Sequence, residues 1–151
     1  MEDFTIFDER VNMKLVTFLF LLCCNLCIAQ MLDDEGQRFI HSFEMAVREH
    51  NTKDVFRHLD KKYRKEQIRF LKGNKTQFIN ELFSGENEAG SYMTPEFNTI
   101  HSITLVDAKE LEGEIATYEV GFEVDIPDYT LYSTLILVRK KKKYVLIGAV
   151  G

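Results

Sequence analysis

The sequence predicts an α+β fold in which N-terminal helices pack on a curved, four-stranded antiparallel meander sheet. Two observations lead to this prediction. Between residues 32 and 83, apolar residues recur every three or four positions, which is the spacing of amphipathic helices. From residue 97 onward the apolar period becomes two, which is typical of strands with one buried face. Because helices and strands occupy separate halves of the chain, we expect separate layers in the fold.

The first two helices are expected to follow each other across a sharp turn. Residues 32–50 carry an apolar stripe, and Asp33 and Asp34 stand where a cap and the helix dipole favour acids. Asn51 is expected to end this helix in the left-handed conformation and to open the next one, since Asn51 and Asp54 have the spacing of a capping pair.

One or two further helices are predicted before the first strand. Asp60 can cap a helix that stops at Gly73. Asn74 and Gln77 then have the spacing of a capping box, and they open a helix that we expect to close at Gly85.

A loop and four long strands complete the predicted fold. Residues 86–96 show little periodicity and contain glycine, serine and proline, so they are expected to form the loop between the layers. Pro127 and Asp128 suit a tight turn inside the meander. The four strands are expected over residues 97–111, 118–126, 129–139 and 144–150.

The beginning of the chain has the pattern of an export signal. Residues 13–29 combine Lys14, a short apolar core and a small-residue exit at Ala29, as in a secretory signal peptide. Residues 1–12 carry four acids against one arginine, which suits no signal, so we infer that translation starts at Met13 and that these residues are a mis-called start. The protein is therefore expected to be exported, either periplasmic or secreted.

Two alternatives to cleavage remain open. An uncleaved anchor is disfavoured because a spanning helix needs about 20 apolar residues, so no stable membrane span is expected after cleavage. A lipoprotein is less favoured because neither Cys23 nor Cys27 follows a small residue. All three cysteines lie in the signal, which leaves residues 31–151 as a single cysteine-free domain without disulfides or thiolate chemistry.

Composition and spacing argue against several classes of function. The net charge of −5 gives no electrostatic reason to expect nucleic acid as a partner. No metal site and no cofactor are expected, since the four histidines show no ligand spacing and the mature domain lacks cysteine. They are His41, His50, His58 and His101.

Helices followed by a curved meander, in about 120 residues behind a signal, resemble the nuclear transport factor 2-like superfamily, the cystatin-like α+β cone proteins. The resemblance is architectural, covers most of residues 32–150, and suggests an exported bacterial member of the Bacteroidetes type. It implies a pocket between helices and sheet that binds a ligand in some members and performs acid-base chemistry in others. One departure is the lack of a convincing short strand between the helices. Cystatin inhibitors match less well, because their Gln-x-Val-x-Gly loop is absent.

Tyrosines are the leading candidates for such a pocket. A tyrosine combines an apolar ring with a polar tip, which suits the mouth of a mostly apolar site, although core packing is the default role of such a residue. His41 and His101 could also reach a pocket, although a surface role is commoner for an isolated histidine. The tyrosine candidates are Tyr63, Tyr92, Tyr118 and Tyr132.

Two surface features concern partners. Residues 135–138 are apolar at every position, so both faces of their strand are apolar and a homodimer through the sheet is predicted. The basic run 139–143 could touch anionic lipid or polysaccharide, but its place between two strands favours a soluble hairpin tip.

Three functions follow from these patterns. The first is a non-catalytic exported domain that binds a small apolar or amphipathic ligand or acts as an envelope interaction module. The second is a pocket enzyme of isomerase, dehydratase or hydrolase type, which would need a buried acid, base or histidine facing the pocket. The third is a structural or partner-binding domain with a filled core. Whether the protein is an enzyme is left open, with no catalytic residue assigned.

Overall fold

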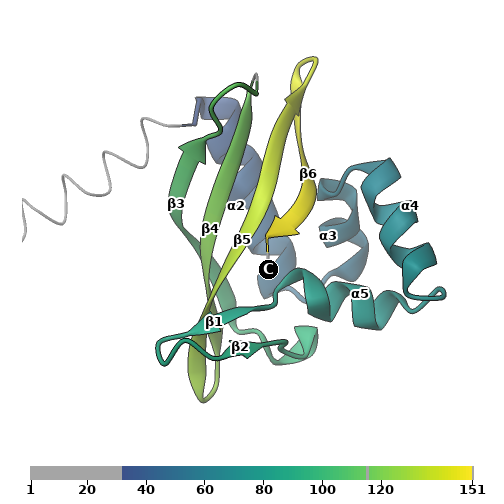
Figure 1. Cartoon of the computed structure of the whole chain (residues 1–151), viewed down its shortest axis with the longest axis vertical. Helices are drawn as coiled ribbons and strands as arrows, with labels where there is room; N and C mark the ends of the chain where they lie inside the picture. Colours follow the sequence, from purple (N-terminus) through teal and green to yellow (C-terminus); the bar gives the residue numbers. More distant parts are fainter. Residues whose placement is uncertain (1–31, 115, 151) are drawn as a thin grey trace, which may run out of the picture.

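The computed structural model describes residues 32–114 and 116–150, which form four helices followed by a six-stranded antiparallel sheet (Figure 1). The predicted α+β class, with helices packed on a sheet, is confirmed. The predictions for residues 1–29 lie outside the described part of the chain. The helices are α2 (Asp34–Arg48), α3 (Thr52–His58), α4 (Lys61–Phe70) and α5 (Lys75–Leu82). The strands are β1 (Gly85–Asn87), β2 (Tyr92–Met93), β3 (Ser102–Glu110), β4 (Thr117–Ile126), β5 (Tyr129–Lys140) and β6 (Lys143–Val150), and a 3-10 turn, η1 (Phe97–Thr99), precedes β3.

A polar residue caps the N-terminus of each of these helices, as their sequence indicates. In every case the side chain accepts a hydrogen bond from a backbone N–H of the first turn, which would otherwise lack a partner. The four caps are Asp33, Asn51, Asp60 and Asn74. Gly73 has the left-handed backbone that ends the turn after α4.

The left-handed residue between α2 and α3 is His50, with φ of 49°, and the prediction that Asn51 takes this conformation is wrong. Asn51 has φ of −85° because its side chain accepts from the Asp54 N–H as the cap of α3. A cap needs extended backbone, so the left-handed turn moves one residue earlier. The His50 ring compensates with a 2.8 Å hydrogen bond between Nε2 and the Ile100 carbonyl.

The predicted meander is present as β3, β4, β5 and β6, but the segment predicted as a loop contains the short hairpin of β1 and β2. The first part of β5 pairs with β1 through Leu131 and Tyr132, and the rest of the same edge pairs with β6. Gly85 permits this contact, because a Cβ there would lie 2.2 Å from the Tyr132 carbonyl oxygen. A three-residue strand with a polar loop leaves no alternating pattern in the sequence, which explains the missed hairpin.

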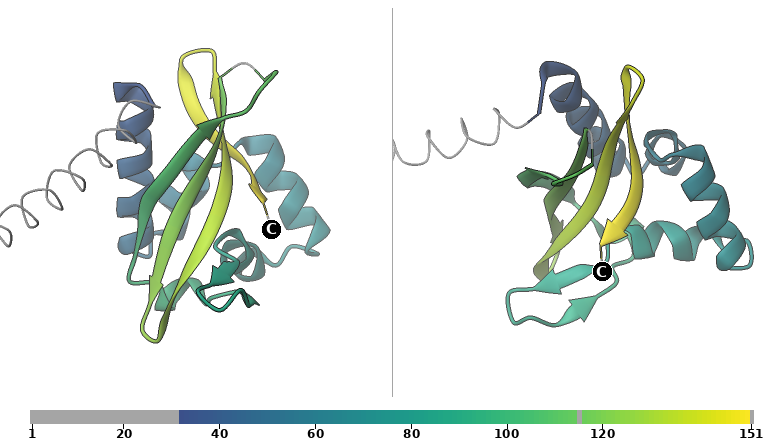
Figure 2. Two further views of the ribbon diagram at one scale, coloured as in Figure 1. Left: turned by 60° about the vertical axis from the view of Figure 1, so that its left-hand side comes forward. Right: turned by 45° about the horizontal axis from the view of Figure 1, so that its top comes forward.

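The helices cover one face of the twisted sheet and extend past its β6 edge. Figures 1 and 2 show α2 lying across the inner face, with α3 beside it and α4 and α5 reaching beyond β6. The centre of the core is Phe43 of α2, whose ring stacks on Phe83 and meets Phe122 of β4 edge to face. The interior between α2 and the sheet is therefore filled with side chains.

Replacing Phe43 by alanine is expected to lower the free energy of unfolding by about 3–5 kcal/mol, because a buried ring is lost and a cavity remains. Phe70→Ala is the matched control, since Phe70 is 79% exposed and its loss should change that free energy by less than about 0.5 kcal/mol. Urea unfolding followed by circular dichroism measures both values. Equal effects of the two substitutions would contradict the central position of Phe43.

Candidate functional site

The strongest candidate site is a cleft of about 460 Å³ at the β6 edge of the sheet, between α4, α5, the β1–β2 hairpin and the end of β6. It brings together Tyr63 and Tyr92, two of the six residues selected from the sequence. The full lining is Tyr63, Gln67, Phe78, Glu81, Leu82, Ser84, Tyr92, Thr94, Gly148 and Ala149.

Tyr63 is fixed at the wall of this cleft. It follows the Asp60 cap by three residues, donates its backbone N–H to Asp60 Oδ1, and packs its ring edge to face on Phe78 of α5. Its hydroxyl is hydrogen-bonded to the backbone of Ala149 on β6. Burial raises the pKa of the Tyr63 hydroxyl above its ordinary value of 10.0, and the negative charge of Glu81 acts in the same direction. Tyr63 is therefore a neutral hydroxyl at physiological pH.

The rest of the lining combines apolar walls with uncharged polar groups. Phe78 and Leu82 are buried and supply the apolar wall, whereas Tyr92 is 55% exposed and stands at the opening. Ser84 and Thr94 join their hydroxyl groups in a 2.7 Å hydrogen bond across the hairpin. Glu81 carries the single charge among the lining residues. Such a surface suits a small molecule with apolar area and a few hydrogen-bonding groups.

The other two candidate tyrosines lie elsewhere on the sheet. Tyr118 is half-buried on the inner face, with its ring centroid 6.4 Å from that of Tyr144. Tyr132 is 45% exposed and pairs with Glu86 of β1. Neither belongs to the cleft lining.

Both candidate histidines lie on the surface. The side chain of His41 is 77% exposed on α2, and its Nδ1 atom is 3.9 Å from Glu44. The side chain of His101 is 61% exposed just before β3, with Nδ1 4.0 Å from Asp125. Neither histidine lines the cleft that contains Tyr63.

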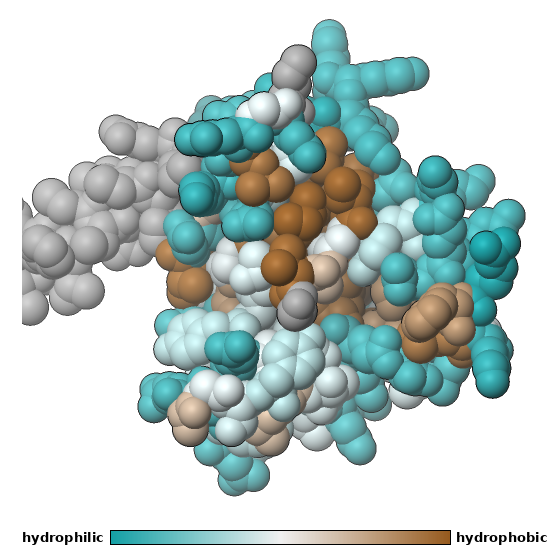
Figure 3. Space-filling view, in the orientation of Figure 1, coloured by the Kyte–Doolittle hydropathy of each residue, from teal (hydrophilic) through white to brown (hydrophobic). Residues whose placement is uncertain are grey.

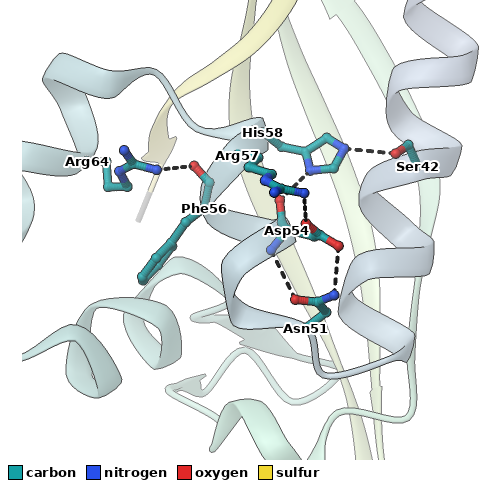
Figure 4. A network of polar contacts seen from close by, with 7 residues as sticks. All are labelled: Ser42, Asn51, Asp54, Phe56, Arg57, His58 and Arg64. Atoms are coloured by element: carbon teal, nitrogen blue, oxygen red, sulfur yellow. Dashed lines mark hydrogen bonds and ion pairs between the residues drawn. The ribbon is translucent and has the colours of Figure 1, made fainter.

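A polar network at the α2–α3 contact was missed by the sequence reasoning (Figure 4). His58 Nδ1 is 2.8 Å from the Asp54 carbonyl oxygen and Nε2 is 3.1 Å from Ser42 Oγ. Because the carbonyl can only accept, Nδ1 carries the hydrogen and neutral Nε2 accepts from the Ser42 hydroxyl. Ser42 and His58 belong to different helices and are sixteen residues apart in the sequence, so a local sequence pattern could not predict their contact.

The Ser42–His58 pair borders a hollow of about 320 Å³ that Arg57 and Glu49 also line. Burial lowers the pKa of His58 below its ordinary 6.5, which keeps the ring neutral and able to accept a proton. A serine nucleophile also needs free N–H donors for the developing oxyanion. The lining residues belong to α2 and α3 or their ends, where helical hydrogen bonds occupy the backbone N–H groups, as for Glu49 and Asp54.

Within residues 32–114 and 116–150, no three His, Cys, Asp or Glu side chains are arranged to hold a metal ion. None of the helices in that part of the chain is long and apolar enough to cross a membrane.

Comparison with known proteins adds no family: no family model matches the chain, and neither does any curated protein or solved structure.

The pKa of His58 predicts how stability depends on pH. Because this pKa is lowered on folding, the unfolded chain binds more protons near pH 6.5, and the free energy of unfolding should fall as the pH drops from about 7.5 to about 5.5. His58→Gln should flatten this dependence, and His41→Gln, at an exposed position, is the matched control. Urea unfolding at several pH values measures the slope. An unchanged slope in His58→Gln would contradict the prediction.

Proposed function

We propose that the chain is an exported, non-catalytic binding domain of the nuclear transport factor 2-like type that takes a small amphipathic ligand in the cleft containing Tyr63. The observation that carries this proposal is the cleft itself. Its volume of about 460 Å³ lies in the range of small-molecule sites. It opens at Tyr92 and is bounded by ordered groups of α4, α5 and β6.

The lining also restricts the charge of the ligand. Glu81 contributes a carboxylate, and Lys, Arg and His are absent from the ten lining residues. An anion would meet no opposite charge there, so a neutral or cationic molecule fits better. Tyr63, Gln67 and Thr94 offer hydrogen bonds, and the exposed ring of Tyr92 offers apolar contact. The ligand class is therefore a neutral or cationic amphipathic molecule.

An enzyme is the alternative, and the Ser42–His58 pair is the observation in its favour. This pair polarises a hydroxyl group, but the backbone N–H groups around it are engaged in α2 and α3. In the cleft, the carboxylate of Glu81 accepts a 2.7 Å hydrogen bond from the side chain of Gln77 and not from a histidine. Catalysis would need free N–H donors beside Ser42 or a histidine beside Glu81, whereas binding needs neither, so we favour binding. A third possibility, a domain with a filled core, fits the packed interior around Phe43 but leaves the cleft unexplained.

Binding to the cleft can be tested with the neutral probe N-phenyl-1-naphthylamine, whose fluorescence rises in apolar surroundings. Tyr92→Ala is expected to weaken the binding of this probe about tenfold, because the ring contributes apolar contact worth on the order of 1–2 kcal/mol. Tyr132→Ala is the control, since Tyr132 has a similar exposure outside the cleft. Fluorescence titration gives both dissociation constants. Equal affinities for the two variants would contradict binding in this cleft.

We further propose that the outer face of the sheet forms a homodimer. Half-buried apolar side chains cover this face along β5 and β6, and Figure 3 shows them as an apolar band on the side turned to the viewer. They include Ile136, Val138, Val145 and Ile147, with Val150 47% exposed at the end. A second copy would cover this band through the same residues, as a two-fold interface requires.

Ile136→Glu is expected to convert a dimer into a monomer, because a charge would be buried without a partner at the centre of the interface. Thr76→Glu places the same charge at an exposed position of α5, away from the sheet face, and serves as the control. Light scattering at high micromolar concentration gives the mass of each protein. A monomeric wild-type protein under these conditions would contradict the proposed dimer.

A further inference from the structure

Helix α4 presents a basic face to solvent. It has no buried residue, and its exposed positions include Lys61, Lys62, Lys65 and Arg69, which we call the α4 basic face. Spacings of three and four residues place these side chains on one side of the helix. Glu66 is the single acid in α4, with Oε1 4.0 Å from Lys62 Nζ. A chain with a net charge of −5 thus concentrates positive charge on one helix.

The last residue of this helix, Phe70, is the most exposed large apolar residue in the described chain, at 79%. Figure 3 shows an apolar patch amid hydrophilic surface where Figure 1 places the junction of α4 and α5. Phe70 is not among the residues that pack on the apolar core, whereas Tyr63, Ile68 and Leu71 of the same segment are. An exposed aromatic ring beside a cationic face is the combination found on helices that lie in membrane interfaces.

We propose that the α4 basic face docks on a membrane surface containing anionic phospholipid, with Phe70 inserted among the lipids. Lysines close to such a surface each contribute attraction that fades within a Debye length. The phenylalanine favours lipid over a soluble polyanion, because its ring offers no hydrogen bond to sugars or phosphates and gains most from an apolar phase. The protein binds the membrane peripherally, through a helix that lies on the surface and does not cross it.

The same helix connects this surface with the cleft. Tyr63 and Phe70 are seven residues apart, two helical turns, so Phe70 lies where the α4 basic face borders the side of the helix that carries Tyr63. A docked α4 would therefore bring the cleft opening close to the lipid, which is a source of amphipathic molecules. The docking inference does not rest on the proposed ligand site, and a cleft without a ligand would leave it unchanged.

The chain contains no tryptophan, so a single substitution creates a specific reporter. In the full-length Phe70→Trp protein, vesicles of equal phosphatidylglycerol and phosphatidylcholine are expected to shift the emission to shorter wavelength, and about 0.5 M salt should reverse the shift. Phosphatidylcholine vesicles alone should give no shift. Tyr132→Trp reports from the sheet and should not respond. If the protein bound the vesicle only through the apolar segment 15–29, the tryptophan at position 70 would stay in water and its emission would not shift. The blue shift therefore reports contact of α4 with the lipid.

Charge removal distinguishes docking by α4 from attraction by net charge. In the Phe70→Trp background, replacing Lys61, Lys62 and Lys65 by glutamine is expected to weaken vesicle binding on the order of a hundredfold. Replacing Lys141 and Lys142 of the β5–β6 turn together with Lys143, the first residue of β6, removes the same charge and should weaken vesicle binding less than about fivefold. Equal losses of vesicle binding from the two sets of lysine substitutions would overturn the proposal, and so would the absence of a blue shift. The proposal would also be overturned if Phe70→Ser bound both heparin and vesicles as well as the wild-type protein does.

Discussion

The packing of Phe43 against the inner face of the sheet is the interaction on which the rest of the structure depends. Its ring contacts three elements, stacking on Phe83 after α5, meeting Phe122 of β4, and lying 5.6 Å from the His58 ring of α3. Phe83 in turn stacks on Phe97 of η1, which fixes the approach to β3. This aromatic group fills the space between α2 and the sheet around Phe43. Free volume appears instead where α4 and α5 reach past β6, since there the sheet no longer lies behind the helices.

Two cations at the end of β5 hold the starts of α2 and α4 against the sheet. Arg139 pairs with Asp33 at 2.9 Å and with Glu35 at 3.3 Å, which ties the start of α2 to the sheet. Its guanidinium also lies 5.6 Å from the centre of the Tyr144 ring, and burial together with the Asp33 carboxylate raises the pKa of Tyr144. The next residue, Lys140, contacts the Asp60 cap of α4 at 2.7 Å, and this bond lowers the pKa of Asp60. All three ion pairs are partly exposed, so each is worth little alone, but they select which helix end meets which strand end.

Local pattern explains how much of this fold the sequence could predict. The caps Asp60 and Asn74 act within three residues of the groups they bind, so the chain itself reveals them. The alternation in β4 likewise reports a face that is buried from Val120 to Ile126. The pairing of β1 with β5 and the roles of Arg139 and Lys140 could not be predicted in this way, because their partners are far away along the chain. The same limit applies to the site: residue type led to Tyr63 and Tyr92, but the hydroxyl group of Ser84 and the carboxylate of Glu81 join them only in three dimensions.

The composition of helix α4 is explained least by its contribution to the stability of the fold. Its propensity is adequate and Asp60 caps it, yet it buries no residue completely, and its most apolar exposed residue is directed to solvent. A helix with this little burial gains little from folding alone, so its composition reflects other demands. On one side it supplies Tyr63 and Gln67 to the cleft, and on another it presents four cations to solvent. Helix α4 thus contributes to the cleft and carries the α4 basic face, while Tyr63, Ile68 and Leu71 pack this segment against the core.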